Sequence, residues 1–129
     1  GVMSIELSSF EVLADDWLLG LGTESGFPNS EKSLLAFEEV CHMTKNEPER
    51  AWEFLLFSKS LYTRSENHLG QIAASLLEDL AGFHGPNFIE RFEEEAVRDI
   101  NFAKMLGSIY QFTTEKEVWE RMQKVAKRW

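Results

Sequence analysis

Apolar residues recur every three or four positions along most of this chain, and the clearest run lies between Asn67 and Gly85. Such spacing is typical of the face of an α-helix that packs against a core. The face consists of Leu69, Ile72, Ala73, Leu76, Leu77, Leu80 and Phe83. Ser65 can cap the first turn, and Gly82 and Gly85 can end the helix. The internal Gly70 costs about 1 kcal/mol relative to alanine, which favours close approach of a neighbouring backbone there.

Two helices and a short arm are predicted at the start of the chain. Alternating apolar and polar residues predict an extended arm over Val2 to Ser8, followed by a helix whose capping box is Ser8 with Glu11. The buried face of that helix is Phe10, Leu13, Ala14, Trp17, Leu18 and Leu21. A loop, Gly22 to Asn29, then leads to a helix capped by Ser30. Its predicted face is Leu34, Phe37, Val40 and Cys41.

The third helix, from about Glu47 to Tyr62, is apolar over so much of its circumference that we expect it to be central. Lys59 falls on its apolar side. A further helix begins at Pro86, where Glu94 and Arg98 have the spacing of an ion pair.

Two helices are predicted after these. One starts near Asn101 and includes Ile109 and Tyr110, and the other opens at a capping box formed by Thr114 and Glu117. Basic residues gather in the last turns of this final helix, where they would stabilise its carboxyl end. They are Arg121, Lys124, Lys127 and Arg128.

The predicted fold class is therefore all-α, with about seven helices in successive antiparallel hairpins. Helix pairs start near Ser30, Ser65 and Asn101, about 35 residues apart, which is the spacing of paired-helix repeats. Two arrangements fit: a compact bundle, or a short right-handed array of the HEAT or tetratricopeptide type. We expect residues 1–129 to form a single all-helical domain.

Composition restricts the classes of partner. The formal charge is 13 − 22 = −9, so phosphate backbones and anionic membrane surfaces repel the chain, and we expect neither nucleic-acid nor membrane binding. A charged protein partner is expected to be basic. With one cysteine and no signal-peptide pattern at the start, the expected location is the cytoplasm. Whether the protein is a monomer or a homo-oligomer stays open.

The sharpest polar cluster is Glu78, Asp79, His84 and Arg91. Carboxylates beside an imidazole can transfer protons or hold a divalent cation. The structural alternative is that His84 binds carbonyl groups at a helix end, and that an acid here pairs with Arg91 or Arg98. Cys41 and His42 are neighbours in a helix, so they point about 100° apart, and we expect Cys41 to be a buried small hydrophobe.

No sequence pattern indicates a catalytic or cofactor site. The chain lacks an H-E-x-x-H motif, a glycine-rich phosphate loop and a G-x-S-x-G elbow. We therefore predict no cofactor, no metal ligands and no catalytic residues. Most aromatic residues lie on predicted helix faces, but Phe27 and Trp129 are harder to bury and would mark a docking surface if they are exposed.

Several segments resemble an uncharacterised bacterial family of short helical proteins catalogued as a domain of unknown function, DUF6869. The similar segments are PERAWEFLL, LGQIAASLLEDLAGFHGPNFIERFEEEAVRD, FAKMLGSIY and VWERMQKV. The resemblance covers the last two thirds of the chain and implies an all-helical bacterial protein without an assigned activity.

Two functions follow as hypotheses. The leading one is a non-enzymatic protein–protein interaction module, because the chain combines negative charge, stacked helices and no catalytic motif. Small acidic helical proteins that neutralise a toxin by binding it have the same profile. The alternative is a small-molecule-binding, metal-binding or enzymatic domain with its site around His84, Glu78 and Asp79.

Overall fold

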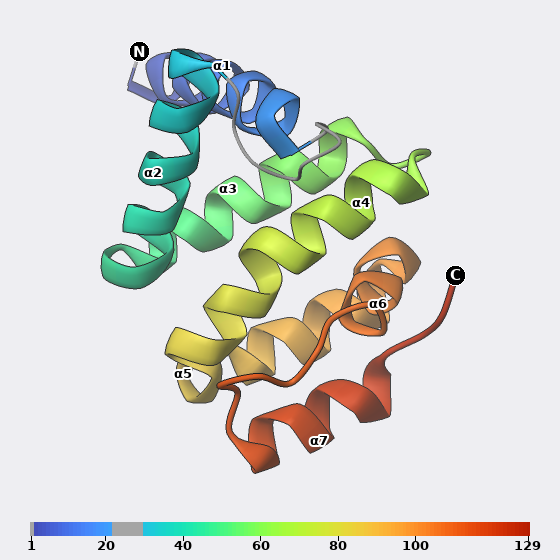
Figure 1. Cartoon of the computed structure of the whole chain (residues 1–129). Helices are drawn as coiled ribbons and strands as arrows, with labels where there is room; N and C mark the ends of the chain where they lie inside the picture. Colours follow the sequence, from blue (N-terminus) through green and yellow to red (C-terminus); the bar gives the residue numbers. More distant parts are fainter. Residues whose placement is uncertain (1, 22–29) are drawn as a thin grey trace.

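The computed structural model describes the backbone of residues 2–21 and 30–129, and the side chains of residues 10–21 and 30–129. Within these ranges the chain is helical and has no strand (Figure 1), which confirms the predicted all-α class. The helices are α1 (Val2–Leu21), α2 (Glu31–Asn46), α3 (Pro48–Leu61), α4 (Glu66–Ile72), α5 (Glu78–Arg98), α6 (Ile100–Leu106) and α7 (Lys116–Val125), with a π-helical segment, Ala73–Leu77, between α4 and α5.

The predicted extended arm over Val2 to Ser8 is wrong, because α1 is already helical at Val2. An extended segment needs a neighbouring strand to satisfy its backbone donors and acceptors, whereas a helix satisfies them internally. The capping box at Ser8 and Glu11 is also wrong, since both positions lie inside the helix. The predicted face is confirmed: Phe10, Ala14, Trp17 and Leu18 are buried, and Leu13 and Leu21 pack against the core.

The predicted buried face of helix α2 is wrong except at Val40, which is buried. Leu34, Phe37 and Cys41 are exposed, and the buried residues are Ser33, Ala36, Val40, Met43 and Thr44. Small side chains permit close helix packing, and the two buried hydroxyls are satisfied locally. Ser30 Oγ donates to Ser33 Oγ at 2.9 Å, and Thr44 Oγ1 donates to the Val40 carbonyl at 2.6 Å. Hydroxyl groups satisfied in this way can be buried at little cost.

Helix α3 is central, as predicted, and contacts α1, α2, α4 and α5. On one side Phe54 packs against Phe10 and Trp17 of α1, with ring centroids 5.3 and 5.5 Å apart. On the other side Trp52 begins an aromatic group that reaches α6, with successive centroids 5.6–6.2 Å apart. This group consists of Trp52, Phe88, Phe92 and Phe102. Aromatic pairs at these separations add to the stability that buried area provides.

The long apolar run forms a bent path of α4, the π-helical segment and the first part of α5. The break predicted at Gly82 to Gly85 falls at His84, whose φ of −133° and ψ of 17° are not helical, and the chain doubles back there (Figure 1). Six of the seven predicted inward residues are buried, and Phe83 is 54% exposed.

Close packing explains some glycines and not others. A Cβ atom on Gly82 would overlap the Thr113 hydroxyl, and one on Gly85 would lie 2.9 Å from Val118 Cγ1. Glycine at both positions therefore lets the segment leading into α7 lie directly against α5. The close approach predicted at Gly70 is wrong, because nothing lies within 4 Å of a Cβ atom there.

The carboxyl-terminal helices are shorter than predicted. Asp99 caps α6 by accepting from the Asn101 amide at 2.9 Å, and α6 ends at Leu106, before Ile109 and Tyr110. The predicted cap at Thr114 is wrong: this residue is buried, and its amide donates to the Gln111 carbonyl in a turn before α7.

The last residues leave the helix and return to α6. α7 ends at Val125, and the Lys127 amide donates to the Ala103 carbonyl at 2.9 Å. A Cβ atom on Gly107 would overlap the Lys127 carbonyl oxygen, so only glycine admits this approach. None of the described helices combines the length and hydropathy that a membrane span requires.

Candidate functional site

The four residues of the predicted polar cluster have separate partners. His84 Nε2 donates to the Lys45 carbonyl at 2.9 Å, near the end of α2, as the structural interpretation predicts. Glu78 Oε2 accepts from the Tyr110 amide at 2.9 Å. Arg91 binds both carboxylate oxygens of Glu49, at 2.6 and 2.9 Å. The predicted pairing of Arg91 with an acid at position 78 or 79 is therefore wrong.

Asp79 lies beside Cys41 of α2. Desolvation, and then the charge of Glu78, raise the pKa of Asp79. Partial desolvation raises the pKa of the Cys41 thiol, and the charges of Asp79 and Glu38 raise it further. The prediction of a buried Cys41 is wrong, but the raised pKa disfavours the thiolate, which is the nucleophilic form. Among the described residues, no group of three or more histidine, cysteine, aspartate or glutamate side chains is placed to hold a metal ion.

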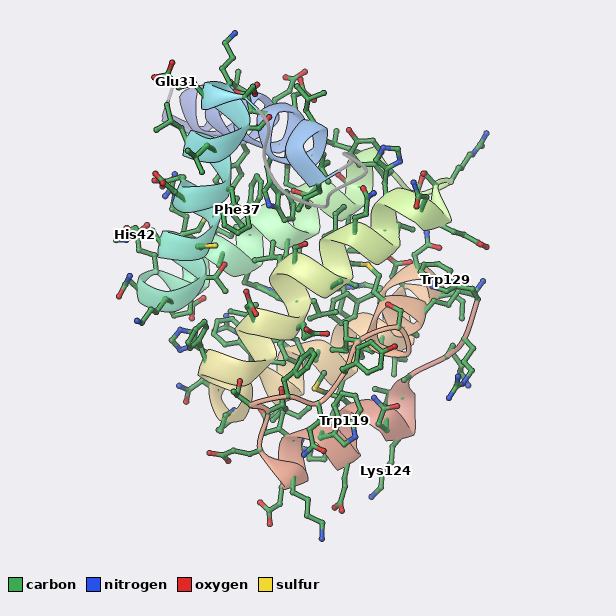
Figure 2. All side chains as sticks on the ribbon, viewed as in Figure 1. Glu31, Phe37, His42, Trp119, Lys124 and Trp129 are labelled. Carbon is green, nitrogen blue, oxygen red and sulfur yellow. The ribbon has the colours of Figure 1, made fainter. Side chains whose placement is uncertain are left out.

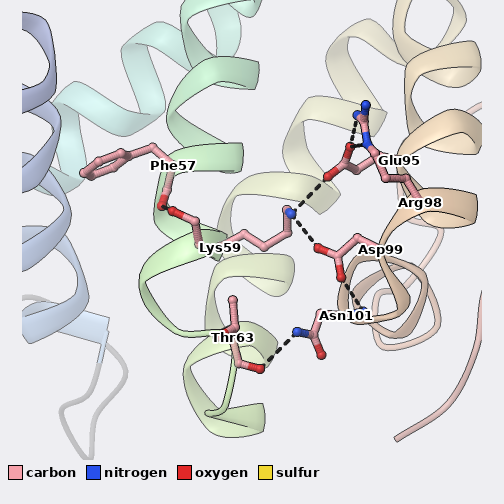
Figure 3. Close-up of polar contacts among 8 residues, drawn as sticks. Phe57, Lys59, Thr63, Glu95, Arg98, Asp99 and Asn101 are labelled. Atoms are coloured by element: carbon pink, nitrogen blue, oxygen red, sulfur yellow. Dashed lines mark hydrogen bonds and ion pairs between the residues drawn. The ribbon is translucent and has the colours of Figure 1, made fainter.

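A buried ion network, which the sequence does not reveal, joins α3 to the junction of α5 and α6 (Figure 3). The Lys59 ammonium lies 2.5 Å from Asp99 Oδ2 and 3.0 Å from Glu95 Oε2. Arg98 binds the other oxygen of Glu95, so the predicted Glu94–Arg98 pair is replaced by Glu95–Arg98. The network is satisfied within the protein, so its role is to fix the three helices.

Lys59 keeps its charge despite burial. Desolvation lowers the pKa of the ammonium, but hydrogen bonds to Asp99 and Glu95 outweigh that effect, and the pKa of Lys59 is raised. A lysine that acts as a general base needs a lowered pKa. The shift at Lys59 therefore indicates a structural ion pair.

A serine and a histidine meet at the start of α4. Ser65 Oγ lies 2.6 Å from His68 Nδ1 and accepts from the His68 amide at 3.4 Å, and the imidazole stacks on Tyr62 with centroids 4.4 Å apart. Tyr62 and His68 line an open recess of about 360 Å³ together with Asp15, Leu18 and Leu19. Because the hydroxyl caps the helix, the pair has the geometry of a capping contact.

The two predicted docking aromatics differ in what the structure shows. Phe27 lies outside the described residues. Trp129 is 42% exposed, and its ring lies 5.7 Å from the Lys104 ammonium. A stronger aromatic pair lies in the segment 107–115 between α6 and α7, which we call the aromatic loop. Tyr110 and Phe112 are 70% and 75% exposed there, with ring centroids 5.9 Å apart.

Several contacts hold the aromatic loop in one shape. Glu78 binds the Tyr110 amide, and the Gln111 carbonyl accepts from the Thr114 amide at 2.8 Å. Gln111 Nε2 donates to the Thr114 carbonyl at 3.2 Å. Phe112 has a φ of 41°, in the left-handed region that bulky residues rarely adopt. This loop could not be predicted from the sequence, because Ile109 and Tyr110 continue the helical spacing of the apolar residues in α6.

Comparison with known proteins identifies a family. The model of a family of unknown function, DUF6869, matches residues 24–129. Neither the curated proteins nor the solved structures gave a significant match.

Proposed function

We propose that this chain, which belongs to the family of unknown function DUF6869, is a non-enzymatic protein–protein interaction module that binds its partner through the aromatic loop. The observation that carries the proposal is the adjacent pair Tyr110 and Phe112, both at least 70% exposed and 5.9 Å apart. Exposed aromatic side chains on a well-held backbone have the character of interface hot spots, because little entropy is lost when they bind.

The conformation of Phe112 supports the same proposal. A left-handed backbone costs a non-glycine residue about 1–2 kcal/mol. The Phe112 side chain is 75% exposed, so burial within this chain does little to offset that cost. Strain kept at an exposed aromatic residue is typical of a site selected for binding.

Charge indicates the chemistry of the partner. With a net charge of −9 the protein attracts cationic surfaces, and the faces of Tyr110 and Phe112 can bind lysine or arginine side chains. The proposed partner is therefore a basic protein. A cationic toxin is one such partner, and a toxin gene beside the gene for this chain would support that form of the proposal.

Site-specific photo-crosslinking in the source organism tests this function. A photoreactive phenylalanine analogue replaces Phe112 in one strain and Leu35, which is 58% exposed on α2, in a control strain. We expect position 112, and not position 35, to capture one dominant basic protein. The purified partner should then bind the Tyr110→Ala/Phe112→Ala variant at least about 30-fold more weakly, equivalent to about 2 kcal/mol. Identical capture at both positions, or unchanged affinity, would refute the proposal.

The alternative site around His84, Glu78 and Asp79 has no comparable support. Glu78 is bonded to the backbone of Tyr110, and His84 to that of Lys45. These contacts assign the two side chains to holding the loop and the end of α2.

A further inference from the structure

An open recess of about 350 Å³ lies where the end of α5 and the start of α6 meet the carboxyl-terminal part of α7. Its lining is Ala96, Val97, Ile100, Lys124, Val125 and Lys127. Val97 is 83% exposed and Ile100 is 56% exposed, so two branched apolar side chains face solvent side by side with lysines. We call this surface the basic recess.

Stabilisation of the α7 carboxyl end explains a cation at Lys124, in the last turn of the helix, but not at Lys127. α7 ends at Val125, so Lys127 and Arg128 lie beyond the helix and only Lys124 is in its last turn. Within the described part of the chain, neither Lys124 nor Lys127 forms an ion pair, and Figure 2 shows Lys124 extending from α7 into solvent. Basic side chains are thus unpaired in a protein that has nine more acids than bases.

The backbone of the basic recess is held in place. The Lys127 amide is bonded to Ala103, and its carbonyl oxygen lies against Gly107. Lys127 is therefore presented from a fixed segment at the side of α6, and Val97 and Ile100 come from the end of α5 and the start of α6. A surface fixed before binding loses less entropy when a partner binds.

We infer that the basic recess docks an acidic segment of a partner protein, with apolar side chains resting on Val97 and Ile100 and carboxylates facing Lys124 and Lys127. Charge complementarity selects acidic residues, and the exposed aliphatic side chains require apolar ones beside them. The openness of the surface favours a protein segment, because a small molecule binds well only where most of its surface is enclosed. None of the residues that line the basic recess belongs to the aromatic loop, so the inference does not rest on the proposed function.

Selection from a random peptide library displayed on phage tests the inference. The full chain is immobilised, and the consensus peptide is synthesised with a fluorescent label for anisotropy titration. We expect a consensus in which aspartate or glutamate flanks leucine, isoleucine or phenylalanine. Its affinity should fall about tenfold or more in Lys124→Glu/Lys127→Glu, and should weaken as the salt concentration rises.

Two further variants separate the contribution of the apolar residues from that of net charge. Val97→Ser/Ile100→Ser, checked for folding by circular dichroism, should also weaken binding about tenfold. Lys32→Glu/Arg64→Glu changes the net charge equally at two exposed positions outside the recess and should change affinity less than about threefold. An equal loss in this control, a consensus without acidic residues, or no enriched peptide would overturn the inference.

Two other occupants would also overturn it. Light scattering that shows a dimer of the wild-type chain, lost in Lys124→Glu/Lys127→Glu, would make a second copy the occupant. Vesicles containing phosphatidylserine that bind the wild type and not this variant would identify a membrane surface instead.

Discussion

Replacing Lys59 with methionine keeps a side chain of similar length but removes its charge, and should destabilise the protein by about 2–4 kcal/mol. The side chains of Lys59 and Glu95 are only 10% and 6% exposed. Removing one partner from a buried ion pair typically costs about 3–5 kcal/mol, because the other charge stays buried. The expected loss extends below that range because Arg98 still binds Glu95, and because Asp99 is 24% exposed.

The contribution of this network should depend on pH at both ends of the scale. Desolvation raises the pKa of Glu95, but hydrogen bonds from Arg98 and Lys59 outweigh it, and the net pKa is lowered. The stabilisation from Glu95 is therefore present above its ordinary pKa of 4.5 and lost as the pH falls through the lowered value. The stabilisation from Lys59 is present below the ordinary lysine pKa of 10.5 and is lost as the pH rises through the raised pKa of Lys59.

Urea unfolding followed by the fluorescence of the buried Trp17 and Trp52 measures the loss. Lys32→Met is the matched control, because Lys32 is exposed, and should change the free energy of unfolding by less than about 0.5 kcal/mol. Adding Glu95→Leu to Lys59→Met should restore part of the stability, since an apolar pair can replace a buried ion pair. A loss below about 1 kcal/mol at neutral pH, or an equal loss in the control, would refute the reasoning.

Three further changes test the packing, the loop and the thiol. In thermal unfolding, Gly107→Ala should lower the free energy of unfolding by about 2–3 kcal/mol, because the added methyl group overlaps the Lys127 carbonyl. Gly70→Ala should raise it by about 1 kcal/mol, because the space beside Gly70 is open. Similar effects of the two substitutions would contradict the described packing. Phe112→Asn should raise the free energy of unfolding by about 0.5–1 kcal/mol, because asparagine tolerates the left-handed backbone, and a loss would contradict the assigned strain. Cys41 should react with a disulfide reagent more slowly than free cysteine at neutral pH, and faster as the pH rises; a rate equal to that of free cysteine would contradict the raised pKa.

The helices themselves could be predicted, because the buried face of a helix requires apolar residues at every third or fourth position of the sequence. The faces of α1 and of the long run from Leu69 to Leu80 are examples. The same rule failed on α2, where Ser33 and Thr44 are buried and Leu34 is exposed. Each of these hydroxyl groups bonds to a residue three or four positions away, so it can be buried at little cost. A pattern of hydrophobic residues does not record such bonds.

The site features depend on contacts between distant residues, and no local pattern contains them. Lys59 and Asp99 are 40 positions apart, and only the doubling back at His84 brings α5 and α6 to α3. Glu78 stands out in the sequence for its charge, but its partner is a backbone amide 32 residues away. Close approach predicted for Gly70 instead occurs at Gly107, where the tail returns to α6.

The hydrogen bond between the Lys127 amide and the Ala103 carbonyl anchors the residues that follow α7 to α6. A stop codon or a proteolytic cut just after Ala126 would remove this anchor without removing any buried core side chain. Helix α7 would then be held only by its packing against α5 and α6. Gly107 would lose the Lys127 carbonyl, the neighbour that excludes a larger residue at its position.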